Sequence, residues 1–529
     1  MEEIQININN SNTKADTKAE SKAETKAETK AETKAETKAE TKAESKEKKV
    51  KGFNDITPPS YTLAHDKRKE DDVIVNVDGL DFKVIPTSDP YILSEDSLPS
   101  KKDKCKFYLC RGPTYLFALL WSFIMAIGRC VTYLTCCLKT YYIMSDEELT
   151  DNFIHKWPLQ AFIKKENDHY VYDASEFGKL KKDIYEEYNI DSVKAYWNDR
   201  LVLEKIEVGD TTYTPEDDKS TNAWSLAKYY VMYTAQIKIR FGTHANRHFP
   251  QNAATVMVNK LYDDSHIVNQ LIKPHIQHMK SNDDNIINSP GSVINSEESV
   301  CCLWNLSAGP GDMIQGYLRE TSRFYPPFLD KAPTPMLQNY YNTIFKFVTE
   351  IIAEAKLEDE SEIAKRKLLF KWLKHYLGYP DLNENKTEDL VKVITYLIFT
   401  MSVLHSAEHY LYTTIPLEGF PMAVKGHISK RSFLPGACWY ASFRLVGFWD
   451  SIKNVFYFNM FTRWWRNRLC CCLSDTRLLT TTYDFENNTE LKKIAKAFRE
   501  GLEEADTLTA RTYPKYYFPL AHCARSIEF

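Results

Sequence analysis

The sequence predicts a mainly α-helical domain preceded by a disordered tail, and three observations support this prediction. Residues 14–49 repeat a Lys-Ala-Glu-Thr unit that has no apolar stripe, so the segment cannot offset the entropy cost of ordering. Apolar residues recur with a period near 3.6 over residues 337–355 and 390–411, as on the buried face of a helix. From residue 145 onward the pattern is mostly helical, with no run of regularly spaced strands.

Composition and charge exclude several classes of protein. Of the 529 residues, 43% are hydrophobic and 13% aromatic, which is enough for a sizeable core. The 68 basic and 72 acidic residues leave a formal charge of −4, so we expect no nucleic-acid partner. The 12 cysteines include no Cys-x-x-Cys pair, which argues against a zinc ribbon. The start of the chain lacks a basic and apolar leader, so we expect a cytoplasmic protein, with membrane association left open.

We divide the chain into four parts: a disordered repeat tail (1–52), a linker (53–104), an apolar helical segment (105–144) and the main helical domain (145–529). The linker is polar and rich in proline, with a short strand predicted at Val73 to Val77.

The apolar segment carries no charge from Gly112 to Gly128 and follows four lysines between residues 101 and 106. It is close to the roughly 20 residues that a membrane-spanning helix needs. The two alternatives are a buried first helix of the main domain, which we favour, and a membrane anchor.

Two pairs of histidines have the spacing of metal ligands. His244 and His248 are four residues apart, as are His405 and His409. Four residues of an α-helix turn through about 400°, so the two rings of a pair lie on one face, about 40° apart. Such a pair can chelate one metal ion. The alternatives are satisfied core histidines at 405 and 409 and a solvated helix end at 244 and 248.

Local signals bear on both helices that carry these pairs. Thr387 is followed by two acids, which predicts a hydroxyl cap at the start of the second helix. Pro250 follows His248 by two residues and is expected to kink the first helix.

The residues around the histidines are similar to those of a known family. Trp224-Ser225-Leu226-Ala227-Lys228 lies 20 residues before His244, and the segment from His266 to His275 ends Lys-Pro-His. Phe324-Tyr325-Pro326-Pro327 precedes the helix predicted at 337–355. These motifs resemble the catalytic domain of lipoxygenases, strongly over residues 224–529 and weakly over 145–223.

The resemblance implies a set of metal ligands from distant parts of the chain, namely His244, His248, His405 and, at the family's weaker fourth position, His409. The family's further ligand is the main-chain carboxylate of the last residue, which here is Phe529. Gln270 and His275 are implied to position the ligands without binding the ion.

The resemblance also implies the chemistry. One non-haem iron, or manganese in its place, would serve a dioxygenase that removes a hydrogen atom from the bis-allylic carbon of a polyunsaturated fatty acid or its lipid ester. O2 then adds to the carbon radical, and the product is a fatty-acid hydroperoxide.

Two departures from the family pattern concern the helix and the N-terminal region. Many lipoxygenases have a five-residue spacing between the first two histidines and a π-bulge that lets both reach the metal. The four-residue spacing here needs no bulge and is similar to that of the fungal branch. The β-barrel lipid-binding module of many animal and plant lipoxygenases has no room before residue 145.

Two competing functions remain. A membrane hydroxylase or desaturase also uses histidine boxes, but it would need more boxes and several membrane spans. The second competing function is a catalytically inactive, membrane-associated scaffold with a lipoxygenase-like fold. Residues 434–473 alternate aromatic residues with arginines and end near the cysteine triplet 470–472, which predicts either a packed aromatic lid, the alternative we favour, or a membrane contact with lipidated cysteines.

Overall fold

The chain divides into two compact units, residues 1–47 and 48–529, and all described residues lie in the second. The computed structural model describes residues 50–51, 73–77, 80–84, 99–135, 144–179, 191–217, 223–288, 329–377, 379–412, 476–485 and 488–527. The repeat tail up to residue 49 and the aromatic stretch 434–473 lie outside these residues, so their assignments stay predictions. At the end of the predicted tail, Val50–Lys51 form a short strand.

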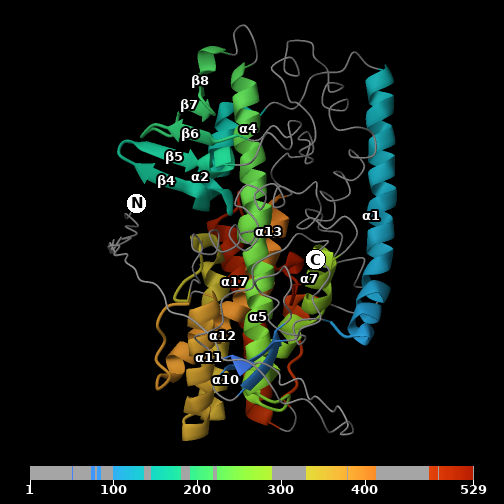
Figure 1. Ribbon diagram of the computed structural model, residues 1–529, viewed down its shortest axis with the longest axis vertical. Coiled ribbons are helices and arrows are strands. Elements are labelled where there is room, and N and C mark those ends of the chain that lie inside the picture. Colours follow the sequence, from blue (N-terminus) through green and yellow to red (C-terminus); the bar gives the residue numbers. More distant parts are fainter. Residues whose placement is uncertain are drawn as a thin grey trace, which may run out of the picture. The chain divides into compact units, whose positions relative to one another are not determined.

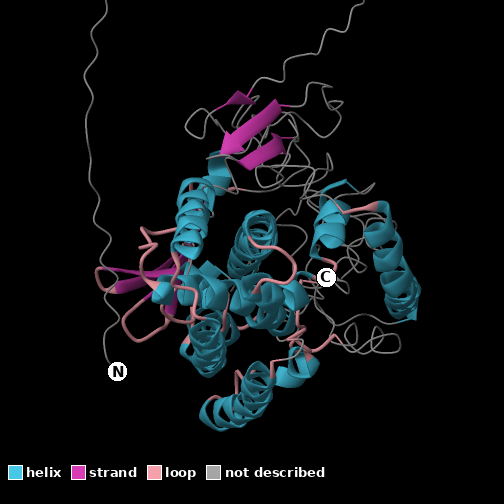
Figure 2. Cartoon of the chain, turned by 90° about the horizontal axis from the view of Figure 1, so that it is seen from below, coloured by secondary structure: helices cyan, strands magenta, loops and turns pink. Residues whose placement is uncertain are grey.

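The described residues are mainly α-helical, as predicted (Figures 1 and 2). One central path runs from α4 (Ala223–Ile237) through η6 (Lys238–His244) into α5 (Ala245–Leu261). A second runs from α12 (Thr387–Phe399) through η9 (Thr400–Leu404) into α13 (His405–Tyr412). The other α-helices are α1 (Lys101–Thr135), α2 (Asp146–His155), α6 (Ile267–Ile272), α7 (Met279–Asn288), α10 (Gln338–Ala355), α11 (Glu360–Leu377) and α17 (Thr489–Thr512). Short 3-10 turns are η3 (Leu159–Phe162), η4 (Ser175–Lys179), η5 (Pro215–Asp217), η7 (Lys273–Ile276), η8 (Pro335–Leu337), η12 (Leu478–Thr480) and η13 (Leu520–His522).

The helix predicted at 337–355 is confirmed as η8 followed by α10. Its buried side chains include Ile344, Phe347, Val348 and Ile351, at the spacing of one helical face. That face packs on α17, where the rings of Phe347 and Phe498 stack with centroids 4.2 Å apart.

The apolar run at 390–411 is buried in the core. Residues 387–410 are apolar and long enough to cross a membrane, but 94% of the most apolar stretch is buried inside the protein. The predicted hydroxyl cap is wrong, because the N-cap is Lys386 and Thr387 is the first helical residue. The Thr387 hydroxyl instead accepts a hydrogen bond from Arg366 Nη1 of α11, at 3.0 Å.

Both central paths contain a π-helical turn directly before a metal-ligand candidate. η6 ends at His244, and η9 ends one residue before His405. A π turn advances the chain by one extra residue and so rotates everything that follows. The expectation that the four-residue spacing needs no bulge is confirmed, because the residues between each pair are α-helical. The π-helical turns that precede the pairs were not predicted. α5 continues through Pro250 to Leu261, at the cost of one backbone hydrogen bond.

A five-stranded antiparallel sheet, which was not predicted, lies between α2 and α4 in the sequence. Its strands follow chain order: β4 (Ile163–Glu166), β5 (His169–Asp173), β6 (Val193–Trp197), β7 (Leu203–Val208) and β8 (Thr211–Tyr213). β6 alternates buried and half-buried residues, so one face is part of the core. This face packs on α4, where the Tyr172 hydroxyl donates to Thr234 Oγ1 at 3.0 Å. Gly209 has a φ of 56°, and a Cβ there would lie 2.9 Å from Asp191 Oδ2, so glycine is required at this turn.

A small sheet precedes α1. Its strands are β1 (Val50–Lys51), β2 (Val73–Val77) and β3 (Leu80–Val84), with β1 parallel and β3 antiparallel to β2. The strand predicted at 73–77 is confirmed.

The apolar segment forms α1, which begins before the predicted boundary at residue 105. Residues 136–143 lie outside the described part of the chain. Several large side chains of α1 are exposed, among them Leu109 at 69% and Leu116 and Ile124 at 58%. The favoured alternative, a buried helix, is therefore wrong for these side chains.

A polar clamp joins α2 to the start of α4. Ser145 and Glu148 form a capping box at the start of α2, and Asp146 in the first turn accepts from Trp224 Nε1 at 2.9 Å. Lys228 Nζ lies 2.7 Å from the same carboxylate, and its side chain is only 7% exposed. Trp224 and Lys228 of the sequence motif, which are four residues apart on α4, thus both bind the Asp146 carboxylate.

We predict that Asp146→Asn lowers the free energy of unfolding by about 1–3 kcal/mol, because the buried Lys228 loses its counter-charge. Denaturant titration measures the loss. Glu490→Gln is the control, since Glu490 pairs with Lys493 at an exposed site where an ion pair contributes about 0–1 kcal/mol. Equal effects of the two substitutions would contradict the clamp.

Candidate metal centre

The structure brings all four predicted histidine ligands to one point. His244 and His248 come from the first central path, and His405 and His409 from the second. The Nε2 atoms of His244 and His248 are 3.0 Å apart, and those of His248 and His405 are 3.1 Å apart. His409 Nε2 lies 3.3 Å from His405 Nε2. Ligand atoms of His244, His405 and His409 all lie within 4.8 Å of one another.

These separations match a single ion with nitrogen ligands. Two imidazole nitrogens about 2.1 Å from one ion and at right angles to each other are about 3.0 Å apart. The ring planes of His244 and His409 lie at 90°, whereas those of His244 and His405 lie at 29°. All four rings are therefore close neighbours in several relative orientations.

Two carboxylates determine which nitrogen of each first-path histidine is free to bind metal. Glu408 Oε2 lies 3.1 Å from His244 Nδ1, and Asp283 Oδ1 lies 3.0 Å from His248 Nδ1. A carboxylate accepts a hydrogen bond from the Nδ1–H group. In a neutral ring held this way, Nε2 is the nitrogen without a proton. Two unprotonated nitrogens 3.0 Å apart repel each other unless a cation lies between them. The donor set therefore fits a metal ion.

Glu408 is itself held in a fully buried ion pair. Its Oε1 accepts from Arg247 Nε at 3.2 Å, and both side chains have at most 1% exposure. Burial raises the pKa of Glu408 to about 7, and the charge and hydrogen bond of Arg247 oppose this rise. The pair joins α5 to α13 beside the four histidines.

Asp283 reaches the centre from α7. Its Oδ2 accepts from Asn252 Nδ2 at 3.0 Å, and Asp283 and Asn252 are both buried. Asn252 lies four residues after His248 on α5. The helix that supplies His248 therefore also orients the Asp283 carboxylate that contacts His248.

His275 positions the C-terminal segment and lies outside the histidine cluster. Its Nδ1 lies 2.6 Å from the carbonyl oxygen of Arg525, and its Nε2 lies 2.9 Å from the Tyr483 hydroxyl. Burial lowers the pKa of His275 to about 4, so the ring is neutral and Nδ1 donates to the carbonyl. Gln270 is half-buried on α6, and within the described residues no hydrogen bond joins its side chain to the cluster.

The C-terminal segment passes beside the second path. Ala524 N donates to Ser406 Oγ at 3.0 Å, next to His405, and Ile527 is fully buried. Phe529 lies outside the described residues, so its carboxylate stays a predicted ligand.

Sequence reasoning missed Glu408, Arg247 and Asp283. Glu408 carried a usable signal, because an acid between two histidines of an otherwise apolar run must be paired when buried. Asp283 carried none, since it lies in a polar stretch with other polar residues.

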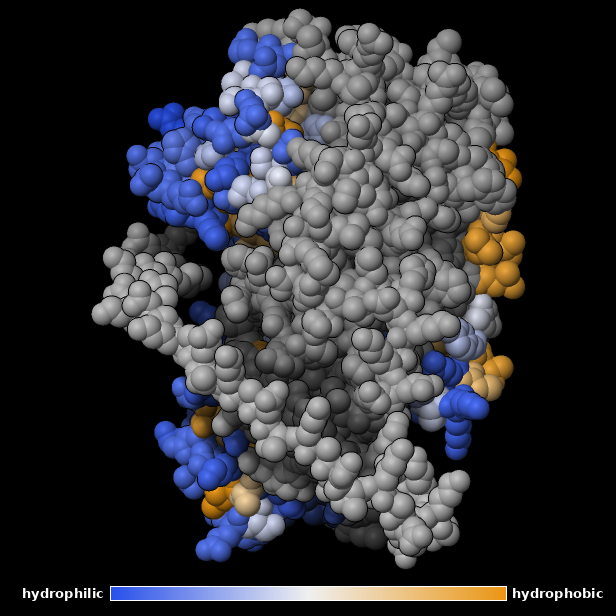
Figure 3. All heavy atoms as spheres, in the orientation of Figure 1, coloured by the Kyte–Doolittle hydropathy of each residue, from blue (hydrophilic) through white to orange (hydrophobic). Residues whose placement is uncertain are grey.

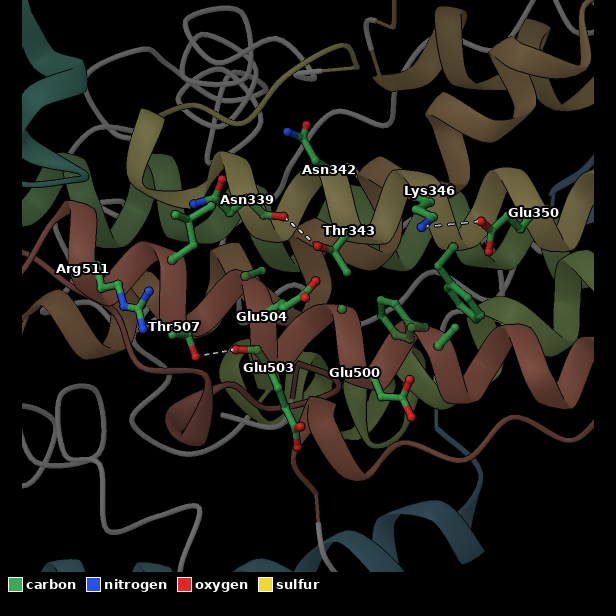
Figure 4. Close-up of a pocket in the computed structure, with 16 residues that line it drawn as sticks. Asn339, Asn342, Thr343, Lys346, Glu350, Glu500, Glu503, Glu504, Thr507 and Arg511 are labelled. Atoms are coloured by element: carbon green, nitrogen blue, oxygen red, sulfur yellow. Dashed lines mark hydrogen bonds and ion pairs between the residues drawn. The ribbon is translucent and has the colours of Figure 1, made fainter.

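A groove of about 760 Å³ lies between α10 and α17 (Figure 4). Its rim is charged and mostly acidic, with Glu350, Glu500, Glu503 and Glu504 against Lys346 and Arg511. None of the four histidines lines it, so it is separate from the metal centre.

Comparisons with known proteins support the fold. No sequence-family profile and no curated protein matches the chain. The crystal structure of the LOX variant Delta413-417:GS matches 83% of this chain and 76% of its own, with a TM-score of 0.57 and 13% identity. The anaerobic structure of that variant with arachidonate matches 83% of this chain and 76% of its own, with a TM-score of 0.54 and 14% identity. The fungal lipoxygenase from Fusarium graminearum matches 73% of this chain and 80% of its own, with a TM-score of 0.51 and 13% identity.

We predict that Glu408→Gln lowers metal affinity by roughly 10–100-fold, because His244 loses the charged acceptor that fixes its tautomer. Stability should also fall by about 3–5 kcal/mol, since Arg247 is left buried and unpaired. Metal titration and denaturation measure the two effects separately.

The matched control for this substitution is Glu362→Gln. Glu362 is a buried acid that pairs with His266 and Lys365 away from the centre. The Glu362→Gln variant should therefore be less stable than the wild type and bind metal with unchanged affinity. If Glu408→Gln behaved in the same way, the carboxylate would not be a positioning group.

We predict a pH dependence from His275. Its folded pKa of about 4 lies below the ordinary value of 6.5, so its contribution is complete above pH 6.5 and is lost as the pH falls toward 4. At pH 5 the loss relative to pH 7 is about 2 kcal/mol. Denaturation at both pH values should show that His275→Gln destabilises the protein less at pH 5 than at pH 7. An equal effect at the two values would refute the assignment.

Proposed function

We propose that this chain, which has the lipoxygenase fold, is a metal-dependent dioxygenase that inserts O2 into polyunsaturated fatty acids and forms hydroperoxides. The observation that carries the proposal is the convergence of four imidazole Nε2 atoms in this fold. A histidine-box desaturase is disfavoured, because its boxes belong to a bundle of membrane spans. Among the described residues, one helix is long and apolar enough to span a membrane, and that helix, at 387–410, is buried in the protein.

The proposed metal is one non-haem iron, with manganese as the alternative. A nitrogen-rich donor set suits these metals, whereas calcium and magnesium prefer oxygen. When bound, the metal supplies the one-electron chemistry that removes a hydrogen atom and returns the electron later.

The chain's own residues hold the geometry and keep water away. Glu408 and Asp283 accept hydrogen bonds from Nδ1 of their histidines, so that Nε2 faces the centre and each ring keeps a fixed orientation. Val403, Leu404 and Ala407 are fully buried around His405. This apolar packing excludes water, which suits a reaction that passes through a carbon radical.

The proposed substrate is a fatty acid with a bis-allylic methylene, free or esterified. Its carbon–hydrogen bond is weak, because the radical left behind spreads over five carbons. A neighbouring structure was solved in complex with arachidonate, which supports a substrate of this class.

The test is purification, elemental analysis and an assay with linoleate or arachidonate, read as conjugated-diene absorbance. We expect iron or manganese near one equivalent per chain, as one four-histidine centre implies, and oxygen-dependent diene formation. His244→Ala, His248→Ala and His405→Ala should lose both metal and activity, and His409→Ala should weaken both.

Two outcomes would contradict the proposal. Full metal retention in the first three variants would show that these histidines are not the ligands. A protein that binds metal but forms no conjugated diene from any of these fatty acids or their phospholipid esters would instead indicate an inactive scaffold.

A further inference from the structure

One face of α1 is apolar and exposed. Leu109, Leu116, Leu120, Ile124 and Ile127 are between 54% and 69% exposed. Their positions differ by three, four or seven residues, so they form one stripe along the helix. Figure 3 shows apolar side chains on the surface at the position of α1 in Figure 1.

Near its start, α1 contacts the protein body on the side opposite the stripe. Phe107 is fully buried, and its ring centroid lies 6.1 Å from that of His278, next to α7. At 100° per residue, position 107 falls about 160° from position 109. The helix is therefore held at Phe107 on the side away from the exposed stripe.

This orientation is the reverse of an ordinary surface helix, which places its apolar face inward. Residues 112–128 contain no charge at all. Soluble monomers rarely expose such a continuous apolar area unless it contacts a partner or a membrane.

A basic cluster stands at the head of the stripe. Lys102 and Lys106 are exposed and continue the same row of the helix, seven and three residues before Leu109. Lys101 is also exposed, and Lys104 is half-buried. The first turn holds one acid, Asp103, whose side chain accepts from Ser100 Oγ. Cations beside an apolar stripe match lipid phosphates beside acyl chains.

We propose that α1 docks this protein on an anionic lipid bilayer, lying along the surface with the stripe in the acyl boundary and the lysines at the headgroups. From Leu109 to Ile127 the stripe is about 27 Å long. A spanning orientation would surround the helix with lipid, whereas the buried Phe107 ties one side to the protein. Docking does not require catalysis, but it would hold a lipid-oxidising centre at a source of lipid.

The test is flotation of the full-length protein with dimyristoyl phosphatidylcholine–phosphatidylserine vesicles. Their saturated chains contain no bis-allylic carbon, so the result is independent of the proposed activity. We expect the wild type to float with the vesicles. Leu116→Glu/Leu120→Glu should lower the bound fraction at least about tenfold, because two apolar contacts are replaced by charges.

Two further variants separate the apolar and the basic contributions. Lys102→Glu/Lys106→Glu should weaken binding to phosphatidylserine-containing vesicles and remove its salt dependence. Val202→Glu is the matched control, since Val202 is 55% exposed on the turn between β6 and β7, and it should bind as the wild type does.

Four results would overturn the proposal. The wild type could fail to float, or the double glutamate variant, with an unchanged circular dichroism spectrum, could float as well as the wild type. The stripe could instead join two copies of the chain, seen as a dimer in light scattering that Leu116→Glu/Leu120→Glu dissociates while no vesicles are bound. Retention in the bilayer after alkaline carbonate extraction would indicate a spanning helix and overturn the surface orientation.

Discussion

The centre of this protein depends on one electrostatic constraint: the Nε2 atoms of four imidazoles follow one another at 3.0–3.3 Å, from His244 through His248 and His405 to His409. Without a cation they repel, and the carboxylates on His244 and His248 prevent either ring from relieving that repulsion by moving its proton to Nε2. The same carboxylates therefore favour a cation at this centre over an empty one. An ion bound there would couple its affinity to folding.

The helices around the centre are arranged to maintain this geometry. The buried pair of Arg247 and Glu408 crosses between the two central paths, so neither path can shift without leaving a charge unpaired in the core. Asp283 connects α7 to His248, and His275 binds the C-terminal segment at the carbonyl of Arg525. Each connection joins residues from different helices or segments, so the arrangement of the four histidines depends on the packing of the whole domain.

Local signals in the sequence were sufficient where the physics is local. The four-residue spacing of the histidines placed each pair on one helical face, and the apolar periodicity located the helices at 337–355 and 390–411. The sheet between Ile163 and Tyr213 was missed, because its strands are three to six residues long and too short to show a clear period of two. The π turns were missed because their register is set by the packing of the whole helix.

The sequence alone determined the helical class, the two histidine pairs and the apolar character of α1, since each follows from spacing or composition along a few turns. Only the tertiary structure decided that Glu408 and Asp283 hold the histidines, and that the apolar side of α1 faces outward. These features depend on which surfaces meet across many residues of chain, 35 between His248 and Asp283 and 161 between Arg247 and Glu408. These contacts are determined by the packing of the complete fold, in which each buried charge needs a partner. They leave no local pattern in the sequence.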